Sequence, residues 1–382
     1  MQETGTSDIP AYLQSLLTVL TETCTPPAYT TLRINSLESN KDEIFQHIQR
    51  EISKIYKDRD RDDPVMYIHP KLSEVIVIES RGPNYHHERS DKEVIVDLAC
   101  GMAVLRGADI FVQGIMGAPT GMQVGDKVSV YSDVDGQCKK GLIKPFTGKK
   151  IYVGNGVTKV SREELFCSGK DLSGVGILMT EPLYEAPSLM EFCPHLVFPQ
   201  NLPSIGRVIA FDKTLKKVEK IKKNCDNWKI TCVEPYVCDA TKSVDEAADL
   251  SGGPPYPPGC FDRILLDGPC SALGQRPAYI SKLNSNSLKS YPTYQRKLFT
   301  KAVDLLKPGG VLVYSTCTIT LEENEKLVAW ALRTFENLKL EPQTPHIGGC
   351  GRCCDGLTEE DLKKLQYFDP CVSSHEDTIK TM

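Results

Sequence analysis

The chain has 382 residues, a formal net charge of -5 and 15 cysteines. Its 40% hydrophobic and 25% charged residues are typical of a globular protein with two or three domains. No apolar run approaches the ~20 residues of a membrane span, and the first residues lack the basic and apolar regions of a signal peptide. We therefore expect a cytoplasmic protein with reduced thiols and no membrane partner. The acidic balance disfavours a generally cationic nucleic-acid binder but leaves local basic patches open.

The first 90 residues predict a mixed α/β region that suggests no chemistry. Apolar residues recur at helical spacing over residues 10–25, and alternation from Tyr29 to Asn35 predicts a strand. A second helix is expected from Asp42 to Lys57, and a second strand from Glu74 to Ile78.

Residues 91–171 predict a small β-barrel. Short apolar strands alternate with glycine-containing turns, which is the pattern of such barrels. The segment 101–157 resembles a PUA domain, an RNA-binding barrel, in the motifs Ala103–Ala108, Gly114-Ile115, Gly125–Val128 and Ile151–Gly156. This resemblance implies contacts to structured RNA ends, and the candidate residues are Arg106, Lys139, Lys140 and Asn155. The alternative is an ordinary barrel with solvated loop residues.

Residues 172–382 predict a parallel, doubly wound α/β sheet, because strands and helices alternate at the required spacing. Strands ending on Asp212 and Asp239 place carboxylates where nucleotide folds bind ribose hydroxyls. A helix from about Tyr291 to Leu306 stops at the Lys-Pro-Gly-Gly sequence that follows. Residues Thr320 to Glu323 predict a capping box that opens the next helix.

Two further strand ends carry reactive side chains. The strand Ile264–Leu266 ends on Asp267-Gly268-Pro269-Cys270, and the strand Val311–Tyr314 ends on Ser315-Thr316-Cys317-Thr318. Ligands of open α/β sheets bind outside the carboxyl ends of strands. Cytosine C5 becomes nucleophilic once a thiolate adds to C6, so two cysteines and a carboxylate suit this chemistry. A lone strand-end cysteine, by contrast, is usually a small buried hydrophobe. Cys350, Cys353 and Cys354 lack a second ligand pair for zinc, so we expect no metal site.

These motifs resemble the Sun (Fmu-type) family of RNA 5-methylcytosine methyltransferases, class I enzymes that use S-adenosylmethionine. The likeness covers nearly the whole chain, and the barrel ahead of the core is similar to the PUA-bearing animal branch, which modifies tRNA acceptor stems. Its further motifs are Thr31–Asn35, Gln200–Ser204, Gln275–Pro277, Tyr294–Leu298, Lys307–Gly310 and Asn324-Glu325.

The resemblance implies a role for each strand-end residue. Cys317 would be the nucleophile, Cys270 would help release the product, and Asp267 would contact the base or the cofactor. Asp212 and Asp239 would hold the ribose and adenine of S-adenosylmethionine. The implied partner is the acceptor end of tRNA, and we expect no DNA substrate and a monomeric protein.

The chain departs from the family pattern in two places. The family has a glycine-rich cofactor loop after Gln200–Ser204, with a strand before it and a helix after it, whereas here Ser204 runs directly into Ile205-Gly206-Arg207. That strand lies mid-sheet in the class I fold, so its loss predicts two interior strands without partners. The family's last strand is also absent before Met382.

Three functions remain open at this stage. The first is a tRNA cytosine-5 methyltransferase whose activity depends on whether the remaining strands form a cofactor site. The second is a non-catalytic RNA-binding protein derived from such an enzyme. The third, a DNA cytosine methyltransferase, is disfavoured by Ser271 after the Pro-Cys pair and by the second cysteine, Cys317.

Overall fold

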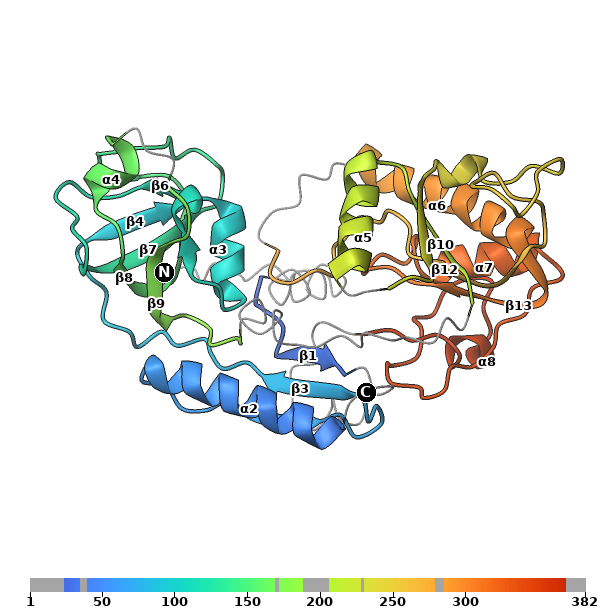
Figure 1. The fold of residues 1–382 in the computed structure, drawn as a ribbon, viewed down its shortest axis with the longest axis horizontal. Helices are drawn as coiled ribbons and strands as arrows, with labels where there is room; N and C mark the ends of the chain where they lie inside the picture. The colour runs from blue at the N-terminus through green and yellow to red at the C-terminus, as the bar shows by residue number, and fades with distance from the viewer. Residues whose placement is uncertain are drawn as a thin grey trace, which may run out of the picture. The chain divides into compact units, whose positions relative to one another are not determined.

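The computed structural model describes residues 24–34, 40–168, 172–187, 206–227, 230–278 and 285–368. The chain divides into two compact units (Figure 1). The first contains residues 1–34, 41–196 and 276–280, and the second contains 35–40, 197–275 and 281–382. Of the helix expected over 10–25, only the last two residues are described.

The first unit begins with a helix packed on a small antiparallel sheet. Its elements are β1 (Tyr29–Arg33), α2 (Lys41–Asp58), β2 (Met66–Ile68) and β3 (Val75–Glu79), with strand order β1-β3-β2. Ile48, Ile52 and Tyr56 recur every four residues on α2 and are buried against the sheet. The predicted helix and both predicted strands are therefore present, and the short β2 was not predicted.

The rest of the first unit is a six-stranded sheet of order β5-β9-β8-β7-β4-β6 around one apolar core. Its elements are β4 (Glu93–Val96), α3 (Leu98–Leu105), β5 (Ile110–Phe111), η1 (Val112–Gly114), β6 (Ile115–Gly117), β7 (Lys127–Asp133), β8 (Lys150–Thr158), α4 (Arg162–Phe166) and β9 (Val175–Pro182). Because β9 pairs with β8, the expected boundary at residue 171 lies too early. Helix α3, whose N-terminus is capped by the Asp97 side chain, was not predicted from the sequence.

The second unit is an α/β arrangement with parallel strands, as predicted. Its elements are β10 (Val208–Asp212), α5 (Leu215–Asn227), β11 (Val233–Val237), η3 (Ala240–Lys242), β12 (Phe261–Leu266), α6 (Ser285–Leu305), β13 (Leu306–Tyr314), α7 (Glu325–Thr334) and α8 (Glu359–Leu362). Helix α6 ends at Leu305, one residue before the predicted Leu306, and it begins earlier than the predicted Tyr291. No described helix is both long enough and apolar enough to cross a bilayer.

The strands of the second unit form two separate pairs, β10–β11 and β12–β13. Among the described residues, β10 and β12 each have one edge without a strand partner. Among the same residues, the other two strands, β11 and β13, also have one free edge each, and the separation into two pairs agrees with the expectation that the shortened sequence interrupts the sheet. The side chain of Tyr256 connects the pairs instead, because its ring stacks on Phe211 of β10 and meets Phe261 of β12 edge-on.

Among the described residues, the apolar cluster of α6 and α7 covers one face of the β12–β13 pair. Leu266, Leu312 and Tyr314 pack against the apolar cluster of α6 and α7. Residues on the opposite face are exposed, and Leu265 in the middle of β12 is 82% exposed. A doubly wound sheet normally has helices on both faces, and this face of the pair is exposed in the described structure.

Candidate active site

Two loops bring Cys270 and Cys317 together at the carboxyl ends of β12 and β13. The strands are parallel, and their register places Leu266 opposite Tyr314, so both loops leave the sheet at the same edge. The Sγ atoms of the two cysteines lie 3.2 Å apart. The structure thus places the two cysteines predicted from the sequence in one site, with the exposed Asp267 on the loop that follows β12.

The segment after Cys270 turns back over the second loop. Ala272 has a φ of 56°, in the left-handed region that non-glycine residues rarely adopt. Gly274 then donates its N–H to the carbonyl of Cys317 at 2.9 Å, and a Cβ there would lie 3.0 Å from that oxygen. Gln275 follows and donates from Nε2 to Cys317 Sγ at 3.6 Å. Gln275 had been noted only as part of the family pattern, and its contact with the thiol could not be read from spacing.

The Cys317 thiol is protonated at neutral pH in the free protein. Partial burial and the contact with Cys270 raise its pKa to about 11, and the negative charge of Asp267 adds to the effect. The hydrogen bond from Gln275 acts in the opposite direction but is weaker. Because the thiolate is the nucleophile, Cys317 becomes reactive only when its proton is removed or its surroundings change.

Glu323 lies beneath both loops. It was predicted as part of a capping box at the start of a helix, but α7 begins only at Glu325, so that prediction is wrong. The Glu323 side chain is 1% exposed and accepts hydrogen bonds from Ser271, Gln295 and Thr320. Glu323 is therefore a residue of the site that sequence reasoning assigned to secondary structure.

The two carboxylates expected to bind the cofactor lie after β10 and β11. Asp212 accepts hydrogen bonds from Thr214 and lies 3.3 Å from Lys217 Nζ. Asp239 is arranged in the same way, and its pKa is lowered to about 2 by hydrogen bonds from Thr241 and Lys213. Both side chains are ionised near neutral pH and remain partly exposed.

The four candidate RNA-binding residues of the barrel fall into two groups. Arg106, Lys139 and Lys140 are exposed, so their positions allow the proposed contact. Asn155 is fully buried, and its side chain bonds to Ser129, Tyr152, Glu88 and Glu181. Asn155 stabilises the barrel and cannot contact RNA, so that assignment is wrong.

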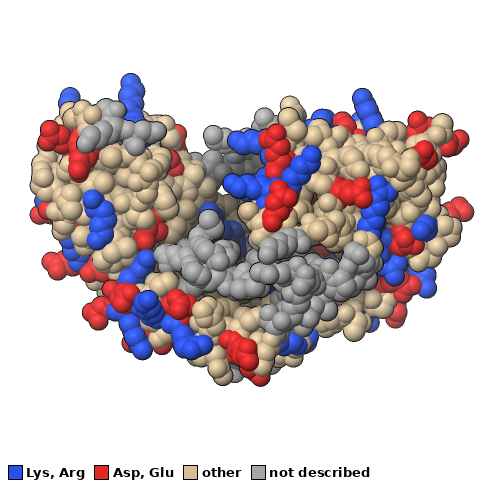
Figure 2. Space-filling view, in the orientation of Figure 1, with Lys and Arg blue, Asp and Glu red and all other residues tan. Residues whose placement is uncertain are grey.

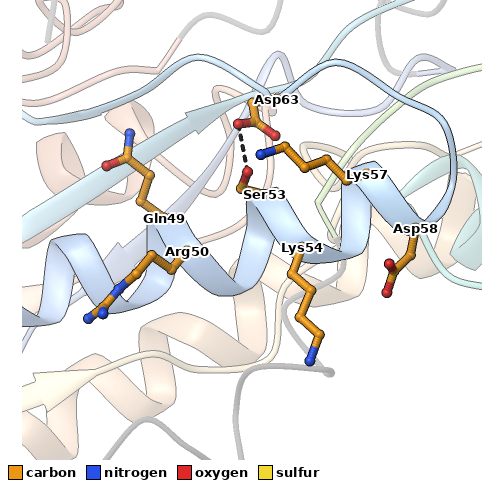
Figure 3. A pocket seen from close by; sticks show the side chains of 7 residues that line it. All are labelled: Gln49, Arg50, Ser53, Lys54, Lys57, Asp58 and Asp63. Atoms are coloured by element: carbon orange, nitrogen blue, oxygen red, sulfur yellow. Dashed lines mark hydrogen bonds between the residues drawn. The ribbon is translucent and has the colours of Figure 1, made fainter.

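Outside the cysteine loops, a surface hollow beside α2 is lined by charges of both signs (Figure 3). Its residues are Gln49, Arg50, Ser53, Lys54, Lys57, Asp58 and Asp63. Lys and Arg are likewise interspersed with Asp and Glu over the face shown in Figure 2.

In the described part of the chain, no three His, Cys, Asp or Glu side chains are grouped to hold a metal ion. Cys371, the next cysteine after the Cys350, Cys353 and Cys354 cluster, lies beyond the described residues.

Comparison with known families supports a methyltransferase core. The family model of the 16S rRNA methyltransferase RsmB/F matches residues 198–351, which include both cysteine loops. The chain is 44% identical over 392 residues to the mouse tRNA (cytosine(72)-C(5))-methyltransferase NSUN6, covering 93% of this chain and 82% of that one. Identity to the human protein of the same name is 42% over 402 residues, covering 94% and 84%.

A solved structure shares the fold. It is the crystal structure of NSun6 from Pyrococcus horikoshii with SFG, an analogue of S-adenosylmethionine. Its TM-score is 0.72 at 24% identity, with 94% of this chain and 91% of that chain covered. The predicted α/β methyltransferase fold with a preceding β-rich domain is thereby confirmed.

Proposed function

The chain belongs to the NSUN6 family of tRNA cytosine-5 methyltransferases, and we propose that it acts on a cytosine of tRNA through the thiols of Cys317 and Cys270. The observation that supports this proposal is the 3.2 Å separation of the two Sγ atoms at adjoining strand ends. Addition to the base and release of the product need two groups that reach the same ring.

In the proposed reaction, Cys317 is the nucleophile and Cys270 is the base. The Cys317 thiolate forms a bond to cytosine C6, and the electron pair of the C5–C6 double bond moves to C5. In this family S-adenosylmethionine supplies the methyl group. Cys270 then takes the proton from C5, the double bond re-forms, and the Cys317–C6 bond breaks. Asp267, exposed beside the thiols, accepts a hydrogen bond from the cytosine amino group.

The described residues fit only part of S-adenosylmethionine. Asp212 and Asp239 offer ionised carboxylates to the ribose and adenine. However, no described strand pairs with the free edge of β10 or of β12 and leads into a loop whose backbone N–H groups could bind the rest of the molecule. The described residues therefore fit S-adenosylmethionine only in part.

The barrel would supply the RNA-binding surface. We assign it as a PUA domain that binds the acceptor end of tRNA, with contacts from Arg106, Lys139 and Lys140, which are exposed. These side chains would contact phosphates and position the RNA. The same proposal includes a monomeric, cytoplasmic protein without a DNA substrate.

A second candidate function is RNA binding without methyl transfer. The unpaired edges of β10 and β12 favour it, because they lie where a class I sheet continues without interruption. In that case the barrel would bind tRNA, and the affinity would not change when S-adenosylmethionine is added.

The test is methylation of unmodified tRNA with radiolabelled S-adenosylmethionine. The first proposal predicts label at a cytosine C5, no label with Cys317→Ala, and a protein–RNA adduct that accumulates with Cys270→Ala. Label transfer at the full rate by Cys317→Ala would contradict the assignment of the nucleophile. Binding of tRNA without any transfer would favour the second candidate.

A further inference from the structure

The buried polar side chains between the two cysteine loops form a connected hydrogen-bond network. A carboxylate out of contact with water is stable only when its oxygens are hydrogen-bonded. Glu323 Oε2 accepts from the Ser271 N–H at 2.9 Å and from Gln295 Nε2 at 2.9 Å. Its Oε1 accepts from the Ser271 hydroxyl at 2.5 Å and from the Thr320 hydroxyl at 2.8 Å. Four donors thus satisfy this side chain.

The direction of the hydrogen bonds follows from the chemistry of the groups. The Ser271 hydroxyl donates to Glu323 Oε1, so its proton points at the carboxyl group. The Ser271 oxygen is 2.6 Å from the hydroxyl of Thr318 and is then free only to accept, so Thr318 donates to it. The result is a chain of hydrogen bonds from Thr318 through Ser271 to Glu323.

This chain connects the cysteine loops at the residues next to the thiols. Ser271 follows Cys270, and Thr318 follows Cys317. Neighbouring groups hold the same loops, since Gln295 also donates to the carbonyl of Pro269 at 3.0 Å. On the other side, Asn324 Nδ2 donates to the carbonyl of Thr318 at 3.0 Å.

We propose that Glu323 is a positioning residue that, through Ser271 and Thr318, sets the separation of the Cys270 and Cys317 thiols. It touches neither thiol, and its effect passes through backbone segments fixed one residue away from each. Its importance for catalysis rests on the proposed function. The geometric claim needs neither RNA nor cofactor, so its failure can be distinguished from failure of that function.

The measurable consequence is the ease with which the two thiols form a disulfide. In a glutathione buffer, one thiolate attacks glutathione disulfide and displaces one glutathione. The second thiolate then attacks the mixed disulfide and displaces the other, so two thiols are oxidised and one glutathione disulfide is reduced to two glutathiones. The distance between the Sγ atoms must shorten from 3.2 Å to about 2.05 Å. Loops that hold the two sulfur atoms close together therefore favour formation of the disulfide.

The experiment titrates the full chain with glutathione redox buffers and quantifies the Cys270–Cys317 disulfide by peptide mass spectrometry. The equilibrium constant gives the effective concentration of one thiol at the other. We expect Glu323→Ala and Thr318→Val to lower it at least about tenfold, while Thr318→Ser retains the wild-type value. Glu322→Gln is the matched control, because its side chain is exposed and pairs with Lys326 on α7.

Thermal melts separate positioning from loss of structure. All titrations are made well below each variant's midpoint, where a change in global stability leaves the effective concentration of a folded site unaffected. If Glu323→Ala does not fold, the near-isosteric Thr318→Val decides the question. An effective concentration within twofold of wild type in folded Thr318→Val, or an equal decrease in Glu322→Gln, would overturn the proposal.

Discussion

The two strand pairs of the second unit, β12–β13 and β10–β11, differ in how the loops at their strand ends are held. The loops after β12 and β13 are joined by a buried network through Glu323 and bring their thiols to 3.2 Å. The loops after β10 and β11 hold Asp212 and Asp239 by local turns and by exposed lysines. The first site depends on contacts between loops, whereas the second consists of two separate local arrangements. Contacts between loops therefore hold the cysteine site together, whereas Asp212 and Asp239 are each held by local contacts.

The largest expected effect concerns the Cys317 thiol. Because its pKa is about 11 and only the thiolate reacts, alkylation by iodoacetamide should rise about five hundredfold from pH 8 to pH 11. The unfolded chain, with an ordinary thiol pKa of about 8.5, should level off above that pH. Between these two values the folded state keeps a proton that the unfolded state has lost, so this thiol makes folding less favourable as pH rises.

The measurement follows labelling of Cys317 by mass spectrometry, with the chain in guanidinium as control. Removing the neighbouring thiol with Cys270→Ala should lower the Cys317 pKa, since the Cys270 contact is one cause of the shift. A plateau near pH 8.5 in the folded wild-type chain would show that the site does not disfavour the thiolate.

A matched pair of substitutions tests whether Tyr256, which connects the two strand pairs, contributes more to the free energy of unfolding than the exposed face of the β12–β13 pair. Tyr256 is fully buried between Phe211 and Phe261, so Tyr256→Ala should cost about 3 kcal/mol of unfolding free energy. Leu265 is 82% exposed, so Leu265→Ala should change it by less than about 0.5 kcal/mol. Denaturant titration of the second unit's transition measures both. A large loss from Leu265→Ala would mean that this face is covered in solution.

A smaller effect is expected from adding the family segment that the chain lacks. Inserting the strand, loop and helix of the mouse relative between Ser204 and Ile205 should strengthen S-adenosylmethionine binding at least about tenfold, or about 1.4 kcal/mol. The reason is that the insert supplies a partner for the free edges of β10 and β12. Calorimetric titration measures the gain, with a glycine-serine insert of equal length as control. Equal micromolar affinity in the original chain would show that its remaining strands already form the site.

Sequence patterns predicted the features that depend on neighbouring residues. The α2 helix, the parallel strands and the cysteines at two strand ends all follow from local hydrophobic periodicity and from the glycine and proline residues that end each element. The consequence of the missing segment for β10 and β12 was also predictable, because strand order follows from the family resemblance. Glu323 and Asn155 were misread for a common physical reason. The sequence around Glu323 matches a capping motif, and Asn155 follows a predicted strand. Neither pattern tells whether the side chain is exposed or hydrogen-bonded to residues distant in the chain.

The central claim is that Cys317 and Cys270 form a working site for cytosine without help from the residues that would hold the cofactor. Its most direct test uses tRNA that carries 5-azacytosine, whose ring nitrogen at position 5 takes a proton after a thiol adds at C6. Adduct formation then needs no methyl donor, and no C5 proton is available for release. We predict a denaturant-stable adduct with the wild-type chain in the absence of S-adenosylmethionine, and none with Cys317→Ala. Wild-type chain that binds this RNA without forming an adduct, or an equal adduct with Cys317→Ala, would contradict the account.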